Sequence, residues 1–288
     1  MTTENLLAID IGATKFALRA AGPHGTWTTR STWPGPDWPA DRKLLCDAVA
    51  RARAELAAPI DRVGLATAAP LDPNGVVATW DARPTWQCVP LLDTLREATD
   101  TATITTLDDG SAAALAEAHN AGCADLVHLS LGSGLTGGII RGGRPVPGTD
   151  LAHLTVDPAG TPCPCGRTGC LRTVASGRAM AIRATEVRGH PTTTAQLAAA
   201  AAANAPWANT VLDEAAIALA TALTELATPT HPTRAHIGGG LGTALPTLAT
   251  RTALALATRS EGLVHTVVAQ ARFGTDAALV GALLAARS

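Results

Sequence analysis

The sequence has little of several residue types, and each scarcity excludes a class of protein. Six of its 288 residues are cysteine and 3% are aromatic, with no tyrosine. A small secreted domain held together by disulfides is excluded, because such scaffolds are dense in cysteine. Charged residues are few and are spread without blocks, for a net charge of −2. Nothing in the charge pattern favours a nucleic-acid partner.

Long apolar runs and targeting signals are also missing. No segment reaches the roughly 18 uninterrupted apolar residues that a transmembrane helix needs. The N-terminal "MTTENLLAIDIG" has no basic region followed by an apolar core and a small-residue cleavage site. We therefore expect a cytoplasmic protein with no membrane partner. Thiols stay reduced there, so clustered cysteines would indicate metal binding before disulfide formation.

The residues that are present indicate an α/β protein of two lobes. The chain is 47% apolar and longer than a typical single core. Strand patterns, beginning with Leu6 to Asp10, alternate with helix patterns along the chain. Strands are expected at "RVGLATAAP", "LVHLSLGSGLTGGII" and "AHIGGGLG", and helices at about 41–58, 110–122, 172–201, 209–227 and "DAALVGALLAA".

Three glycine-rich turns each follow an apolar strand: "DIGATK" at Asp10 to Lys15, "LGSGLTGG" at Leu131 to Gly138, and "GGGLGTA" at Gly238 to Ala244. Glycine lets backbone N–H groups approach an anion closely. A single such turn is typical of a tight hairpin with glycine at positive φ. Three of them, with an acid and a Lys-Thr pair in the first, favour phosphate binding. Neither a Walker A loop nor a Rossmann fingerprint is present.

Paired acids and clustered cysteines supply the remaining chemistry. Asp108 and Asp109 stand between a predicted strand and a predicted helix; capping accounts for one carboxylate, and the other is placed to act as a general base.

Three cysteines follow the spacing C-x-C-x₄-C, ten residues after a histidine. Three thiolates and an imidazole make a closed tetrahedral set for structural zinc, and the alternative is a group of unligated core thiols. These ligands are His153, Cys163, Cys165 and Cys170.

Taken in order, these motifs resemble the landmarks of the ROK family of sugar kinases and repressors, over nearly the whole chain. The segments are "DIGATK", "DDGSAAALAE", "LGSGLTGGII", "HLTVDPAG" leading into "CPCGRTGC", and "IGGGLG". The family's zinc signature, C-x-C-G-x-x-G-C-x-E, is the most specific of them. The resemblance implies an actin-like, hexokinase-type fold: a smaller lobe over 1–110 joined by the C-terminal helix of about 275–288, and a larger lobe over 111–274.

The resemblance also implies functional residues and cofactors. Asp109 would be the catalytic base. ATP and Mg²⁺ would be bound by Asp10, Gly12, Thr14, Lys15, Gly132, Ser133, Gly134, Gly239 and Gly240. The substrate would be bound by Asp81, Asp108, Asp150, His153 and Arg172. No DNA-binding extension precedes the first strand, so the kinases are resembled and not the repressors. Homodimers are frequent in the family.

The departures from the family pattern concern the implied sugar contacts. Family kinases usually have Asn where this chain has Asp108, Glu-x-Gly-His where it has Asp150 to His153, and Glu where it has Arg172. A guanidinium only donates hydrogen bonds, so it cannot replace an accepting carboxylate. We therefore expect phosphorylation of a primary hydroxyl of a cyclitol or a modified or amino sugar of secondary metabolism. The alternatives are a glucokinase whose Arg172 faces solvent or pairs with Asp150, and a catalytically silent sugar-binding regulator.

One loop adds to the predicted substrate site. "ATWDARPTW", Ala78 to Trp86, lies where the family approaches sugar and carries Asp81, Arg83 and two tryptophans. Trp80 and Trp86 would form a substrate wall or pack against the lobe surface, and the sequence leaves both open.

Overall fold

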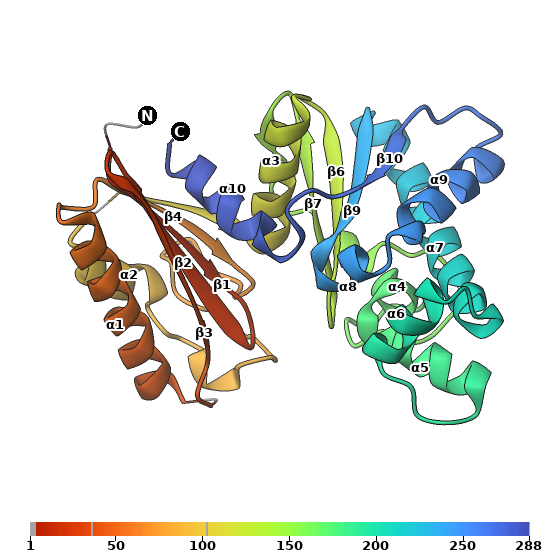
Figure 1. Ribbon diagram of the computed structural model, residues 1–288, viewed down its shortest axis with the longest axis horizontal. Coiled ribbons are helices and arrows are strands. Elements are labelled where there is room, and N and C mark those ends of the chain that lie inside the picture. Colours follow the sequence, from red (N-terminus) through yellow and green to blue (C-terminus); the bar gives the residue numbers. More distant parts are fainter. Residues whose placement is uncertain (1–3, 36, 102, 288) are drawn as a thin grey trace. The chain divides into compact units, whose positions relative to one another are not determined.

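The computed structural model describes residues 4–35, 37–101 and 103–287, apart from the side chain of residue 228. The chain divides into two compact units, unit 1 of Met1–Ala112 with Ala278–Ser288 and unit 2 of Ala113–Ala277. Figure 1 shows the elements of both units along the chain. Within the described ranges, no helix is both long and apolar enough to cross a bilayer.

Unit 1 is built on one mixed sheet with the strand order β3-β2-β1-β4-β5. The first three strands pair antiparallel, whereas β1, β4 and β5 run parallel. Its elements are β1 (Leu6–Ile11), β2 (Lys15–Gly22), β3 (Gly25–Thr32), α1 (Trp38–Leu56), β4 (Arg62–Thr67), the 3₁₀ turn η1 (Pro84–Trp86), α2 (Leu91–Thr99), β5 (Ile104–Asp108), the start of α3 (Asp109–Ala121) and most of α10 (Ala277–Ala285).

The alternation of side chains along β1 divides the core of unit 1 between two faces of the sheet. Leu7 and Ile9 belong to a buried cluster that includes Leu45 of α1, while Ala8 packs with Ala282 of α10. Figure 1 shows α1 and α10 on opposite sides of this sheet. A Cβ on Gly64 of β4 would lie 1.8 Å from the carbonyl oxygen of Ala282. Helix α10 therefore seats directly on the backbone of β4.

Unit 2 repeats this plan with a second five-stranded sheet, ordered β10-β9-β6-β7-β8. Its strands are β6 (Leu126–Leu131), β7 (Leu135–Arg141), β8 (Arg144–Pro145), β9 (Arg234–Gly238) and β10 (Val267–Gln270). Its helices are the rest of α3, η2 (Leu151–His153), α4 (Arg172–Ala175), α5 (Gly177–Arg188), α6 (Thr194–Ala202), α7 (Pro206–Thr230), α8 (Gly239–Ala244), α9 (Thr247–Arg259) and η3 (Gly274–Asp276).

The two sheets share one topology, in which an antiparallel meander is followed by two parallel strands. The turn between β1 and β2 in unit 1 therefore corresponds to the turn between β6 and β7 in unit 2. These are the first two glycine-rich turns of the sequence. The predicted two-lobed α/β fold is confirmed, and the repeat of the plan explains why similar turns recur about 120 residues apart.

Several parts of the fold differ from the expectations: α2, α9 and β10 were not expected, and the helical stretch of 172–201 is divided into α4, α5 and α6. The segment Gly238 to Ala244, expected as a glycine turn, begins helix α8 at Gly239, whose φ is +77°. The hairpin of β2 and β3 was not expected, because β3 ("GTWTTRST") is an edge strand with no buried residue and so lacks an apolar signal.

A buried charged cluster joins strand, helix and loop in unit 2. Glu117 of α3 accepts hydrogen bonds from the backbone N–H groups of Arg272 and Phe273 and lies 2.9 Å from Nδ1 of His236. Burial raises the pKa of Glu117, but these hydrogen bonds outweigh it and the net pKa is lowered. His128, paired with His236 across β6 and β9, is fully buried. Burial lowers its pKa to about 4.

This cluster makes the fold sensitive to acid. His128 has an ordinary pKa of 6.5 when unfolded and about 4 when folded, so between these values the unfolded chain binds more protons. Lowering the pH through that window should cost roughly 3 kcal/mol of stability. The paired Glu117, with its lowered pKa, contributes stability that is also lost as the pH falls. The substitution His128→Leu should flatten the pH dependence of the thermal unfolding midpoint between pH 7 and pH 5. An unchanged slope in the variant would contradict this assignment.

Candidate active site

The carboxyl edge of the unit 1 sheet collects the predicted residues of that unit. The register pairs Ile11 with Thr67 across β1 and β4, and Thr67 with Asp108 across β4 and β5. The ends of β1 and β5 are thus two strand spacings apart, about 10 Å. The turn from Asp10 to Lys15 and the acids at 108 and 109 therefore lie along one edge. Ligands of open α/β sheets bind at such carboxyl edges.

The turn at this edge exposes its polar side chains. The N–H of Gly12 donates to the carbonyl of Lys15 at 2.9 Å and closes the turn. Thr14 and Lys15 are exposed, and Asp10 is half-buried. A hydroxyl and an ammonium thus stand in solvent beside a partly shielded carboxylate, the donor and acceptor set that a phosphate with its cation requires.

The two adjacent acids have separate surroundings. Oδ1 of Asp108 accepts the N–H of Ser111 at 2.7 Å and so caps the first turn of α3. Asp109 is the first residue of α3 and is half-buried. Because Asp108 does the capping, capping does not explain Asp109. The positive end of the helix dipole stabilises a carboxylate in this position.

The carboxyl edge of the unit 2 sheet carries the second and third glycine motifs. Ser130 of β6 pairs with Gly238 of β9, so the segments that follow both strands are neighbours. A Cβ on Gly132 or Gly134 would meet no described atom within 4 Å, and neither residue has a positive φ. Neither backbone geometry nor packing therefore requires glycine at these two positions. Space for an approaching ligand does account for glycine there. At Gly239, by contrast, a Cβ would lie 2.5 Å from the carbonyl oxygen of Leu131.

A cavity of about 410 Å³ adjoins this turn within unit 2. Ser133 and Gly134 line one part of it, and Arg172, Ser176 and Arg178 line others. The N–H groups of Gly177 and Arg178 donate to the carbonyls of Gly132 and Ser133, at 3.0 and 3.1 Å, which fixes α5 against the turn. The predicted phosphate turn and the predicted substrate residue Arg172 therefore share one hollow.

The predicted zinc ligands meet in unit 2, where their ligand atoms all lie within 4.8 Å of one another. Sγ of Cys165 is 3.6 Å from Sγ of Cys170, and Sγ of Cys163 is 3.4 Å from Nδ1 of His153. Tetrahedral zinc with Zn–S bonds of about 2.3 Å separates two sulfur atoms by about 3.8 Å. The donor set and the spacing fit a structural zinc ion.

The three thiols lie close enough to influence one another's ionisation. Burial, with the neighbouring thiols, raises the pKa of Cys170 to about 12. The pKa of the exposed Cys165 is lowered, chiefly by a backbone hydrogen bond from Arg167. Three thiols this close would not all ionise alone, and a divalent cation supplies the missing positive charge.

Two of the predicted substrate residues lie beside the imidazole of His153, itself a predicted substrate residue. Nε2 of His153 lies 3.8 Å from Oδ2 of Asp150 and 3.4 Å from Nη1 of Arg172. With Nδ1 toward the thiols, Nε2 and the two charged side chains remain on the other side of the ring. Arg172 is half-buried and lines the cavity.

The loop of residues 78–86 is divided between surface and core. Asp81 is exposed, but Trp80 and Trp86 are only 8% and 0% exposed and belong to the apolar core of unit 1. Of the two alternatives left open by the sequence, packing against the lobe is confirmed for both tryptophans, and the prediction that they form a substrate wall is wrong. Arg83 is also buried, which the sequence did not indicate.

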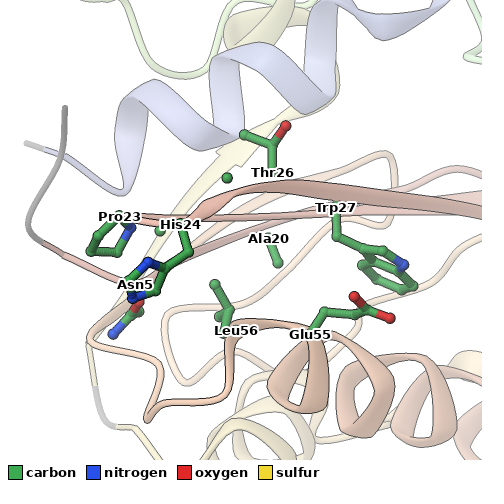
Figure 2. Close-up of a pocket in the computed structure, with 10 residues that line it drawn as sticks. Asn5, Ala20, Pro23, His24, Thr26, Trp27, Glu55 and Leu56 are labelled. Atoms are coloured by element: carbon green, nitrogen blue, oxygen red, sulfur yellow. The ribbon is translucent and has the colours of Figure 1, made fainter.

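A separate hollow of about 170 Å³ lies at the opposite end of the unit 1 sheet (Figure 2). Asn5 and His24 line one side of it, and Trp27 and Glu55 line the other. It opens beside the β2–β3 turn, and no predicted site residue reaches it.

Comparison with known proteins agrees with the motifs. The ROK family matches residues 6–288. The chain belongs to the ROK family. The cysteine cluster is consistent with the zinc site of that family.

Three sugar kinases are similar to this chain over most of its length. A kanosamine kinase of Amycolatopsis mediterranei is 37% identical over 254 residues, which cover 85% of this chain and 84% of the relative. The ROK hexokinase of Thermus thermophilus superposes with a TM-score of 0.86 at 30% identity, over 98% of both chains. A ROK glucokinase of Streptomyces griseus, in complex with glucose and AMPPNP, superposes with a TM-score of 0.80 at 26% identity, over 98% of this chain and 99% of that one. The chain is an ATP-dependent sugar kinase of the ROK family.

The cysteine cluster yields a direct prediction. The purified protein should contain about one zinc ion per chain, and Cys165→Ser should lose it, since a closed site needs all four ligands. The thermal unfolding midpoint should fall with the metal. Cys88→Ser, at an exposed cysteine outside the cluster, should keep both. Retention of zinc by the Cys165 variant, measured by elemental analysis, would contradict the ligand assignment.

Proposed function

We propose that this ROK kinase transfers the γ-phosphoryl group of ATP to a primary hydroxyl of an amino sugar. The supporting observation is that the carboxyl edge of unit 1 places Asp10, Thr14 and Lys15 along the same sheet edge as Asp109. Asp109 takes the proton of the attacking hydroxyl. Thr14 and Lys15 stabilise charge on the phosphoryl oxygens, and Asp10 orients the hydrated Mg²⁺ that accompanies ATP.

The turn of unit 2 would hold the rest of the nucleotide. Phosphate can approach the backbone at Gly132 and Gly134 closely because no Cβ intervenes there, and Arg178, which lines the adjoining cavity, offers a guanidinium to a polyanion. Gly239 and Gly240 follow the neighbouring strand at the same edge. We assign these residues to ATP.

An amino substituent on the substrate is favoured by charge at two positions. Asp108 uses Oδ1 for the helix cap, so Oδ2 remains as an acceptor for an ammonium group. Asp150 adds a second exposed carboxylate beside His153. Arg172 donates to a hydroxyl oxygen where a family carboxylate would accept, so the pattern of hydrogen bonds differs from that of a glucose site. Similarity to a kanosamine kinase supports the same substrate class.

Glucose is the second candidate. The similarity to a glucokinase favours it, and a C7-cyclitol is a third ring that would present the same primary hydroxyl. Neither has an ammonium group to pair with Asp108 and Asp150.

The catalytic assignment is tested by Asp109→Asn. The variant should lose turnover by on the order of 10³-fold or more, because no base accepts the hydroxyl proton, while MgADP affinity stays near that of the wild type. Phosphorylation is followed by ADP release and MgADP binding by calorimetry. Turnover equal to the wild type would remove Asp109 from the mechanism.

The role of Asp108 in substrate specificity is tested by Asp108→Asn. Asparagine caps a helix as well as aspartate does, so the fold is preserved and only the charge is lost. The ratio of kcat/KM for kanosamine to that for glucose should fall about 10-fold or more, as expected for the loss of one charged hydrogen bond. An unchanged ratio would exclude Asp108 from recognition of the amino group.

A further inference from the structure

A buried ion pair lies directly beneath the turn from Asp10 to Lys15. Arg83, from the loop before η1, donates through Nη2 to Oδ2 of Asp41 on α1 and to the carbonyl of Gly35. The side chains of Arg83 and Asp41 are only 6% and 0% exposed. Nε1 of Trp86 also donates to Oδ2 of Asp41, at 2.9 Å. The charge on each partner is therefore balanced inside the core of unit 1.

Tryptophans enclose this pair. The guanidinium carbon lies 5.4 and 5.5 Å from the ring centroids of Trp33 and Trp86, within range of cation–π attraction. The ring of Trp86 packs edge-on against Trp33, Trp38 and Trp80. Two tryptophans thus flank the guanidinium, and two more support the ring of Trp86.

The cluster holds the turn through three consecutive carbonyl groups. Nε1 of Trp33 donates to the carbonyl of Gly12 at 2.9 Å, and Nη1 of Arg83 donates to that of Ala13 at 3.0 Å. The backbone N–H of Trp33 donates to the carbonyl of Thr14 at 3.1 Å. With three carbonyl oxygens drawn toward the core, the turn is fixed in one conformation and the side chains of Thr14 and Lys15 stay in solvent.

We propose that Arg83 is a positioning residue that sets the geometry of the phosphate-binding turn in this chain. The inference rests on the proposed function, in which Thr14, Lys15 and Asp10 serve ATP and its Mg²⁺. Arg83 also belongs to the loop that carries Asp81, so the guanidinium ties the predicted substrate loop to the phosphate turn. A single donor would not suffice, because the acceptors on Asp41, Gly35 and Ala13 lie in different directions and need the fork of a guanidinium.

The test is Arg83→Lys. Lysine keeps the positive charge for Asp41 but cannot also reach the carbonyl of Ala13. We expect kcat/KM for MgATP to fall on the order of 10- to 100-fold and the dissociation constant of MgADP, measured by calorimetry, to rise about 10-fold. The KM for the sugar at saturating MgATP should change less than these values. Trp33→Phe, which removes the donor to Gly12 and keeps an aromatic ring beside Arg83, should weaken MgADP binding in the same direction by a few-fold.

The matched control is Arg251→Lys, at the partly buried ion pair between Arg251 of α9 and Asp213 of α7. It should lower the thermal midpoint while leaving both kinetic constants unchanged. If Arg83→Lys behaves like this control, with lower stability but wild-type kcat, KM and MgADP affinity per folded molecule, the proposal is wrong. Wild-type MgADP binding by Trp33→Phe would overturn it as well, even if Arg83→Lys does not fold. Absence of any turnover or MgADP binding by the wild type would instead overturn the proposed function, and this role with it.

Discussion

The parallel pairing of β1, β4 and β5, and its counterpart in unit 2, is the constraint on which the rest of the site depends. Parallel strands end at the same edge of a sheet, so each chain segment that leaves this edge is delivered to one place. In unit 1 the segments are the first glycine-rich turn and the acids at the start of α3. In unit 2 they are the second glycine turn and the start of α8. Residues about 100 positions apart are thereby brought to one edge of each sheet.

The small residues around these edges then have distinct physical roles. Gly64 admits α10 against the sheet, and Gly239 adopts a backbone conformation that side chains disfavour. Gly132 and Gly134 satisfy neither need and leave open space beside the backbone of the turn. A glycine motif in the sequence therefore combines packing glycines with binding glycines, and only the environment of each Cβ separates them.

Local motifs made much of the site predictable from the sequence. Three motifs each lie within a dozen residues: the strand-turn pattern at Asp10, the strand-helix junction at Asp109 and the cysteine spacing. They can therefore be recognised in the sequence without knowledge of tertiary contacts. The sequence placed Arg83 beside Asp81 near a substrate surface, whereas the structure buries it against Asp41, 42 residues earlier in the chain. One signal was available: Asp41 lies on the buried stripe of α1 that continues through Leu45 and Val49, and a charge on an apolar stripe requires a buried partner.

The proposed function depends most on the charge at Asp108, which would select an amino sugar over glucose. The most direct measurement is ADP release with MgATP across kanosamine, N-acetylmannosamine, a valienol-type cyclitol and glucose, with Asp109→Asn as the blank. We predict that kanosamine, which carries an ammonium group, exceeds glucose at least about 10-fold in kcat/KM. A kcat/KM for glucose equal to or higher than that for kanosamine would contradict the claim and favour a glucokinase.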